Sequence, residues 1–204
     1  MAIAGKVGAV LLQTEESPVA FIKEPATGNV ERTIYTIENE TCRYLDKYSP
    51  FSVYVNDIAV TAGYIAEHLG GAVRFSSPLD LGDEVTISGN RINVEQAGGF
   101  FNWSAELSAD TSDVTTFESQ GWKENLPTIN GFSASAESYW ADEQLSKRLG
   151  QEVIVALYLD TGINKKRYEG YAVISGDGIE LSVEDVVSEN ITFEGSGILT
   201  YRED

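Results

Sequence analysis

The sequence predicts a mainly β fold, a β-sandwich or barrel with one short α-helix. Nineteen glycines and ten tyrosines among 204 residues favour strands joined by turns. Several segments alternate apolar and polar side chains with a period of two, which is the spacing of a half-buried strand. Only residues 142–150 carry the start and stop signals of a helix.

The first 33 residues are expected to form an N-terminal arm around one short strand. Val7–Leu12 is a short apolar run, and the polar stretch after it contains Pro18, Pro25 and a turn at Thr27–Asn29. The run is too short and too poorly flanked for a signal peptide or a membrane span. We therefore expect an extended arm on a soluble intracellular product.

Residues 34–93 are expected to form an inserted or elaborated β-unit. Phe51–Val55 alternates in the manner of a strand, Asn56 and Asp57 make a turn, and Ile58–Thr61 follows, which together predict a hairpin. This unit precedes the main region, residues 94–204, of a single domain that spans residues 1–204.

The main region begins with two strands joined by a polar loop. Every second residue from Phe101 to Leu107 is apolar and the residues between are Asn, Ser and Glu, so we expect a strand with one solvated face. Residues 110–127 are expected to be the loop and residues 132–140 the second strand. Trp103 and Trp140 fall in strand-like phases and are expected in the core, whereas Trp122 is expected to dock against another surface.

The remaining elements follow from charge and periodicity. Residues 142–150 have acids in the first turn, bases in the last turn and Gly150 at the end, which favours a short helix. Val153–Leu159 is apolar in both phases and predicts a central, buried strand. Strands over residues 168–175, 179–184 and 191–201 complete a β-rich C-terminal half.

The chain carries little that resembles catalytic or metal chemistry. Cys42 and His68 are the only residues of their kinds, so neither an internal disulfide nor an ordinary zinc site can be built. Glu194 stands where the first glycine of a nucleophile elbow would be, and no phosphate-binding glycine loop occurs. We expect no enzyme, no catalytic or metal-binding residue and no cofactor, although paired carboxylates of a glycosidase remain an alternative.

The charge balance is strongly acidic. Fourteen Lys and Arg stand against 32 Asp and Glu, which gives a net charge of −18 at pH 7. Such a surface repels phosphates and disfavours tight binding of nucleic acid. From Tyr168 to Tyr201 there is no basic residue, and Glu180 and Glu184 share one strand phase there, opposite Ile179, Leu181 and Val183. This pattern indicates one anionic face, either a plain solvated sheet or the lining of an assembly.

The order of these parts resembles the major tail tube proteins of long-tailed, siphovirus-like bacteriophages. The resemblance is strongest over residues 101–204, about half of the chain. It rests on Trp103–Leu107, Asp113–Phe117, Gly121–Glu124, Tyr139 and Trp140 before the short helix, Tyr168–Gly170 and Phe193–Gly197, together with the opening residues Met1–Lys6.

This resemblance implies a tail-tube-type β-sandwich flanked by a short helix. Six such subunits would join their sheets into a ring-wide β-barrel, and rings would stack into a tube whose electronegative lumen conducts the genome during ejection. Glu180 and Glu184 are then the candidate lumen-facing acids. The segments expected to join rings or subunits are Met1–Glu24 and Asp110–Pro127. The candidate contact residues of the second segment are Asp113, Phe117, Trp122, Lys123 and Glu124.

The same resemblance implies the partners and the location. They would be further copies of the chain, the tail tip or initiator, the tape measure and tail terminator proteins, and double-stranded DNA passing through without specific binding, with no membrane. The protein would be assembled in the cytoplasm of the bacterial host and reside in the tail of the virion. Alternatives are a β-sandwich adhesion or carbohydrate-binding virion module that uses residues 34–93, and the inner tube of a contractile tail-like machine.

Overall fold

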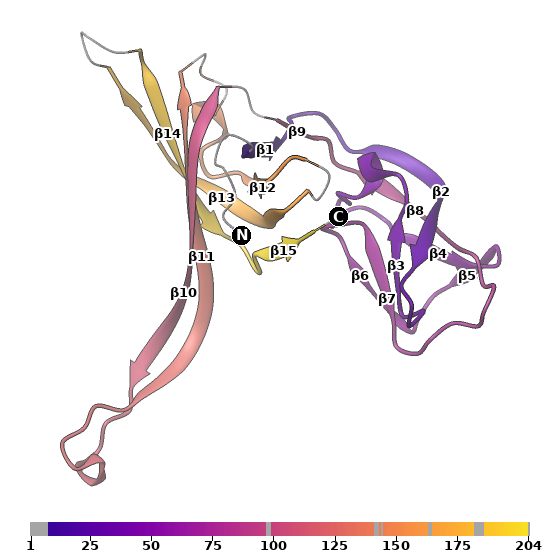
Figure 1. Ribbon diagram of the computed structural model, residues 1–204, viewed down its shortest axis with the longest axis horizontal. Helices are drawn as coiled ribbons and strands as arrows, with labels where there is room; N and C mark the ends of the chain where they lie inside the picture. Colours follow the sequence, from indigo (N-terminus) through magenta and orange to yellow (C-terminus); the bar gives the residue numbers. More distant parts are fainter. Residues whose placement is uncertain are drawn as a thin grey trace. The chain divides into compact units, whose positions relative to one another are not determined.

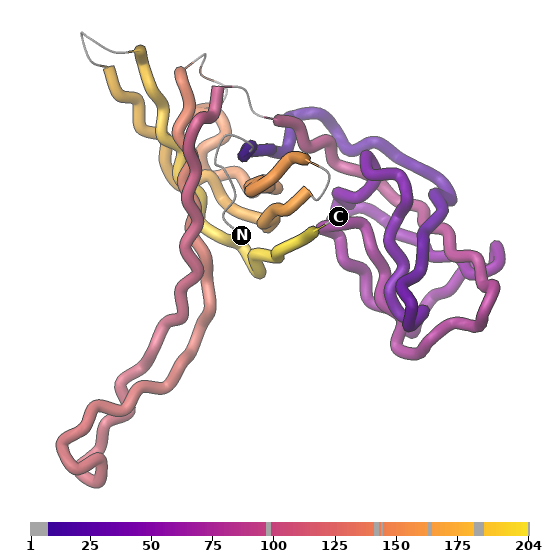
Figure 2. Tube along the Cα trace, in the orientation of Figure 1, coloured from indigo at the N-terminus to yellow at the C-terminus, as the bar shows by residue number. Residues whose placement is uncertain are grey.

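The computed structural model describes residues 8–96, 99–140, 143, 145–162, 165–181 and 186–203. The fold is mainly β, with 57% of the residues in strands, as the sequence predicts. The chain divides into two compact units, whose residues can be followed by colour in Figures 1 and 2. Unit 1 consists of Met1–Leu12 and Gln96–Asp204, and unit 2 consists of Gln13–Glu95. Unit 2 is therefore inserted into the chain of unit 1 directly after its first strand.

Unit 1 is built on an eight-stranded sheet in the order β10-β11-β14-β13-β12-β1-β9, with β15 paired to β13. The pairs β10–β11, β11–β14, β14–β13, β13–β12, β12–β1 and β13–β15 are antiparallel. The strands are β1 (Ala9–Gln13), β9 (Val94–Gln96), β10 (Phe100–Asp113), β11 (Asn125–Tyr139), β12 (Glu152–Tyr158), β13 (Arg167–Glu180), β14 (Ser188–Gly195) and β15 (Thr200–Arg202).

The core of unit 1 lies against one face of this sheet. Strand β12 is the central buried strand that its sequence predicts, since Val153–Leu157 are each at most 1% exposed. Alternate residues of the neighbouring strands complete the core, among them Val10, Phe132, Ala136, Ile174, Ile191 and Phe193.

Two glycines leave the space that the Phe132 ring occupies in that core. A Cβ atom on Gly170 would lie 2.9 Å from Cζ of Phe132, and a Cβ atom on Gly195 would lie closer still to the same ring. Neither site tolerates a larger side chain without moving the ring, because the interior is close-packed. The ring is held where β11, β13 and β14 come together, since Phe132, Gly170 and Gly195 belong to these strands.

Unit 2 is a seven-stranded sheet in the order β5-β4-β8-β2-β3-β7-β6. Its core is a separate cluster that includes Ile37, Val53, Val73 and Ile87. The strands are β2 (Val19–Gly28), β3 (Ile34–Ile37), β4 (Ser52–Val55), β5 (Ile58–Val60), β6 (Tyr64–Glu67), β7 (Ala72–Phe75) and β8 (Val85–Arg91).

The hairpin expected within unit 2 is confirmed. Strands β4 and β5 pair in register from Val55↔Ile58 to Val53↔Val60. Asn56 and Asp57 between them have φ values of 51° and 65°, the left-handed values that a tight two-residue hairpin turn requires.

The expectation that residues 1–33 form an extended arm is wrong for Val19–Gly28. This segment is strand β2, which lies inside the sheet of unit 2 between β8 and β3. Pro25 suggested a loop, but the register shifts between Phe21 and Glu24, and Lys23 at φ 50° forms a bulge. Pro25 lies opposite Glu38, just past the end of β3, and its carbonyl accepts from Glu38 N at 3.0 Å, so its missing N–H falls where β3 has already ended. Met1–Val7 lie outside the described residues.

Of the helix expected over residues 142–150, the described residues 143 and 145–150 contain only a 3-10 helix, η4 (Ser146–Arg148), while Asp142 and Gln144 lie outside the described residues. Within the described part of the chain, the other helical segments are also three-residue 3-10 helices, η2 (Glu40–Cys42) and η3 (Phe117–Ser119). A segment of nine residues between two strands is too short to sustain an α-helix by local bonds alone.

Candidate functional site

One face of the strands β10, β11, β14 and β13 carries almost only polar side chains. Residues that pair across neighbouring strands share a face, so the register identifies the members. This polar face consists of Asn102, Ser104, Glu106, Ser133, Ser135, Glu137, Asn190, Thr192, Glu194, Val173, Gly176, Gly178 and Glu180, with Ser188 and Tyr139 at one end. None of these residues is Lys or Arg. The opposite face of the same strands supplies the core of unit 1.

Several side chains of the polar face hydrogen-bond to one another across the strands. The hydroxyls of Ser104 and Ser135 are 2.9 Å apart, and Nδ2 of Asn102 donates to Oε2 of Glu137 at 3.3 Å. Ser175, beside this set, donates from Oγ to Oγ1 of Thr192 at 3.3 Å. The surface is therefore hydrophilic and anionic, with negative charge from Glu106, Glu137, Glu180 and Glu194.

The strand register shows where the two candidate acids, Glu180 and Glu184, fall. Glu180 pairs with Ser188 and lies on the polar face, whereas Glu184 lies outside the described residues. The apolar phase expected opposite them is not buried within the chain, because Ile179 is 56% and Leu181 is 77% exposed. Glu106, Glu137 and Glu194 were not singled out, although the alternation around residues 101–108 marks one solvated face.

The four strands of the polar face have two edges without a strand partner among the described residues. Strand β10 is the outer strand of the sheet and pairs only with β11. Strand β13 pairs with β12 only as far as Val173, so Gly176–Glu180 have β14 on one side and no strand on the other. Exposed edges of this kind present N–H and C=O groups to another chain.

Strands β10 and β11 continue as a long hairpin beyond the rest of the sheet (Figure 1). Their pairing extends to Asp113↔Asn125, while the pairing of β11 with β14 ends at Ser133↔Glu194. The polar loop expected over residues 110–127 is thus largely strand, and only residues 114–124 form the turn, called the hairpin tip below. A polar pattern suggested a loop because both faces of a projecting hairpin are solvated.

The hairpin tip is an ordered turn held by its own hydrogen bonds. Thr116 caps η3, since its hydroxyl accepts from Glu118 N at 3.3 Å and its N–H donates to Oγ of Ser119 at 3.0 Å. Val114 N donates to the Glu124 carbonyl at 2.9 Å, and Glu124 N donates to Oγ1 of Thr115 at 3.0 Å. The capping box and the cross-bonds fix the backbone of the tip.

The tip presents two aromatic side chains to solvent. Phe117 is 108% exposed and Trp122 is 80% exposed. Exposed aromatic side chains often mark protein–protein contacts, and Trp is among the residues most enriched at their hot spots. Trp122 is exposed on the tip, and its docking against another surface stays a prediction.

The polar candidates lie around the same tip. Hydrogen bonds from the Thr115 hydroxyl and backbone N–H lower the pKa of the Asp113 carboxyl, and the Thr115 N to Oδ1 distance is 3.0 Å. Nζ of Lys123 is 3.8 Å from Oδ2 of Asp113, and both side chains are exposed, so the pair adds little stability. The structure thus brings Asp113, Lys123 and Glu124 together with the two aromatics.

The other two tryptophans differ from each other. Trp103 is half-buried against the core and donates from Nε1 to the Tyr158 carbonyl at 3.3 Å, in agreement with its expected place. Trp140 is 40% exposed, so its expected core position is wrong. It follows the end of β11, where Tyr139 is also exposed and packs on Phe101 at 4.9 Å between ring centroids.

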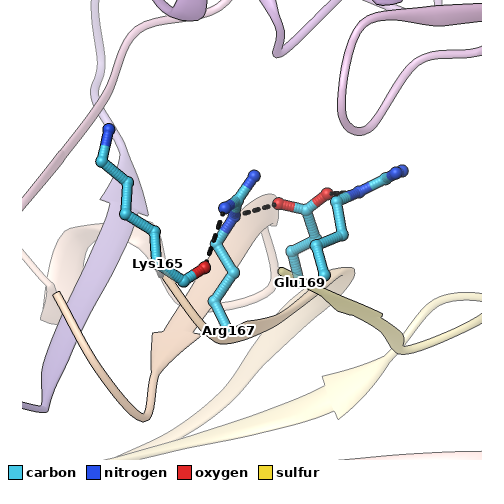
Figure 3. A network of polar contacts seen from close by, with 4 residues as sticks. Lys165, Arg167 and Glu169 are labelled. Carbon is cyan, nitrogen blue, oxygen red and sulfur yellow. Dashed lines mark hydrogen bonds and ion pairs between the residues drawn. The ribbon is translucent and has the colours of Figure 1, made fainter. Parts of the chain in front are cut away.

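A buried charge cluster holds the C-terminal strand β15 to β13 (Figure 3). Glu169 is 0% exposed, and its Oε2 lies 3.0 Å from Nε of Arg167, which is 4% exposed. Oε1 of Glu169 accepts from Nε of Arg202, and Nη1 of Arg167 donates to the Lys165 carbonyl at 3.3 Å. Nζ of Lys166 lies 3.1 Å from Oε1 of Glu203, so Lys166 and Arg167 both pair with carboxylates within the chain.

The described residues contain neither a candidate metal site nor a membrane-spanning helix. Across them, no group of three or more His, Cys, Asp and Glu could hold a metal ion. In the same part of the chain, no helix is long and apolar enough to cross a membrane.

Comparisons with known proteins are sparse. No family model matches the chain, and no curated protein matches it. Among solved structures, a chain from the virion of a native gene transfer agent particle matches with 21% identity and a TM-score of 0.42, covering 53% of this chain and 88% of that chain. A chain from the tail of an empty gene transfer agent particle matches with 20% identity and a TM-score of 0.43, covering 53% and 85%. Similarity at this level assigns neither a family nor a function.

Proposed function

We propose that the chain is a structural subunit of rings that stack into the tail tube of a long-tailed, phage-like particle and conduct its DNA. The observation that carries this proposal is the polar face of β10, β11, β14 and β13. It combines an anionic surface free of Lys and Arg with two strand edges that are open for pairing with other copies.

Ring formation follows from the direction of these strands. Neighbouring strands in the order β10-β11-β14-β13 are antiparallel, so β10 and β13 run in opposite directions. Rotation of a copy about an axis along the strands keeps those directions. The β13 edge of one copy would then meet the β10 edge of the next in an antiparallel pair, and a head-to-tail contact of this kind closes into a ring.

The size of the ring is compatible with a DNA conduit. Six copies, the number that the family resemblance implies, would contribute roughly 24 strands at about 4.8 Å each. The circumference is then about 115 Å and the diameter between opposite backbones about 37 Å before strand tilt widens it. This leaves space for a double helix inside the side chains.

The polar face would line the lumen. Glu106, Glu137, Glu180 and Glu194 from every copy would give the bore a negative potential. DNA binds proteins largely through release of counterions when Lys and Arg neutralise phosphates, so a bore without these bases lets it slide. Glu184 remains a candidate for the same lining.

The hairpin tip would join one ring to the next through Phe117 and Trp122. Stacked rings would be a non-enzymatic virion component that is assembled in the host cytoplasm. The remaining partners would be the initiator at the tail tip, the tape measure and the terminator.

Electron microscopy in negative stain, with sedimentation of the same purified protein at high concentration, tests the proposal. Rings and hollow tubes are the expected result. Monomers or closed oligomers that never stack, over a wide range of concentration and salt, would contradict it.

A further inference from the structure

An apolar groove of about 680 Å³ lies at the root of the β10–β11 hairpin. Leu107, Ala109 and Phe132 of the hairpin line one side, and Gly195, Ile198 and Leu199, after β14, line the other. Leu107 is 65% and Ile198 is 81% exposed, so this groove presents apolar walls to solvent.

The groove exists because the sheet divides at this point. Strand β14 pairs with β11 as far as Ser133↔Glu194, and the chain then leaves the sheet for residues 196–199. It returns as β15, which pairs with β13 at Arg167–Glu169 instead of continuing beside β11. Gly197 at φ 114° allows the excursion, because an L side chain is strained there. The space between the departing hairpin and the excursion is the groove.

We propose that this groove receives the hairpin tip of a second copy of the chain, with Phe117 and Trp122 seated between Leu107 and Ile198. The inference rests on the proposed stacking of rings and names the surface that receives the tip. The groove lies part-way along the hairpin, beside Leu107–Ala109 and Asn130–Phe132, whereas the tip, residues 114–124, lies at its free end (Figure 2). Each copy therefore offers one tip and one groove. If successive copies are displaced along the hairpin direction, the tip of each copy occupies the groove of the next, and the series does not close on itself, as an open-ended stack requires.

The amount of buried surface explains why the contact needs rings. Two aromatic side chains bury about 150–250 Å² each. One tip in one groove therefore falls well below the roughly 1,200 Å² of a stable protein–protein interface. Between two rings, six such contacts form together. Once one has formed, the others are held close to their partners at a high effective concentration, so the combined contact is much stronger than a single one. Monomers are accordingly expected not to pair through this site, whereas rings stack.

The tip is suited to this role because its backbone is already fixed by the capping box of η3 and the Val114–Glu124 bond. A pre-ordered turn loses little conformational entropy on docking. The apolar lining of the groove matches the two aromatics and would not suit a charged segment, which would have to lose its hydration.

Disulfide trapping tests the inference directly. The variant carries Lys123→Cys at the tip and Ile198→Cys at the groove, and the native Cys42 is 3% exposed and does not compete. Mild oxidation of assembled protein is expected to give an open ladder of covalent multimers, because each copy carries both cysteines. The single variants, and a control pair of Lys123→Cys with Ser175→Cys beside the polar face, are expected to give no ladder.

A competing pair makes the result decisive. Lys123→Cys with Tyr139→Cys would crosslink if the tip instead reached the exposed aromatics at the opposite end of the sheet. If electron microscopy shows tubes but the groove pair gives no ladder, or the Tyr139 pair gives one, the groove is not the docking site. In either case the proposed tube still stands. Neither tubes nor a ladder would overturn the groove and the proposed function together.

A second variant separates the steps of assembly. Ile198→Asp places a charge in the groove at an exposed position, so the monomer should fold normally while the critical concentration for stacking rises at least about 100-fold. Leu81→Asp in unit 2, at a residue that is 90% exposed, is the matched control and should leave stacking unchanged. Equal stacking by both variants would contradict the inference.

Discussion

Replacement of Trp122 by alanine should leave the monomer intact and weaken its assembly strongly. The side chain is 80% exposed, and the bond that Trp122 contributes to the turn, from its N–H to the Ser119 carbonyl at 2.9 Å, is a backbone bond that alanine retains, so the loss of the side chain should change the free energy of unfolding by less than about 0.5 kcal/mol. If docking buries about 150 Å² of the indole at roughly 25 cal/mol per Å², the lost contact is worth about 4 kcal/mol. At 1.4 kcal/mol per tenfold, the critical concentration should rise on the order of several hundred-fold.

The assay measures two quantities on the same preparation. Sedimentation over a concentration series gives the critical concentration, and urea unfolding gives the stability of the monomer. Leu81→Ala, at a residue with similar exposure in unit 2, controls for the general loss of exposed apolar surface. A Trp122→Ala protein that assembles at the concentration of the parent, or that unfolds at clearly lower urea, would refute the reasoning.

Four further predictions concern the core, the polar face, ionic strength and the buried charges. Phe132→Ala should cost about 3–5 kcal/mol of stability in urea unfolding, because the ring packs on Gly170 and Gly195, and a cost below 1 kcal/mol would contradict that packing. Glu180→Lys with Glu194→Lys should leave rings intact but make tubes retain DNA at low salt, and tubes that still release DNA freely would remove these residues from the bore. Raising NaCl from 10 to 150 mM should lower the critical concentration, because the net charge of −18 is screened as the Debye length falls from about 30 to about 8 Å, and an increase would show that attraction between charges drives assembly. Glu169→Gln should destabilise the monomer by about 3–5 kcal/mol, since Arg167 and Arg202 lose their buried partner, and unchanged melting would mean that the cluster adds nothing.

The sequence was sufficient where local pattern and structure agree. Val153–Leu157 are buried on both faces as their continuous apolar run predicts, and the Asn56–Asp57 turn forms the hairpin that its residues favour. These elements depend on neighbours in the chain or on simple burial, and both are visible in the residues themselves.

The sequence was insufficient where distant pairing decides the outcome. Val19–Gly28 looked like a loop because of Pro25, yet β8 and β3 flank it and the missing N–H of Pro25 falls just past the end of β3. Residues 110–113 and 125–130 belong to long strands that pair with each other while their side chains stay exposed on both faces. The membership of Glu106, Glu137 and Glu194 in one face requires the register of three strands, which periodicity alone does not give.

A cryo-electron microscopy reconstruction of the assembled protein tests the central claim most directly. The account predicts a hollow tube whose bore is lined by the polar face, with Glu106, Glu137, Glu180 and Glu194 pointing inward and β13 of each copy paired to β10 of the next. A tube with this face on the outside, or rings joined through other edges, would contradict the claim.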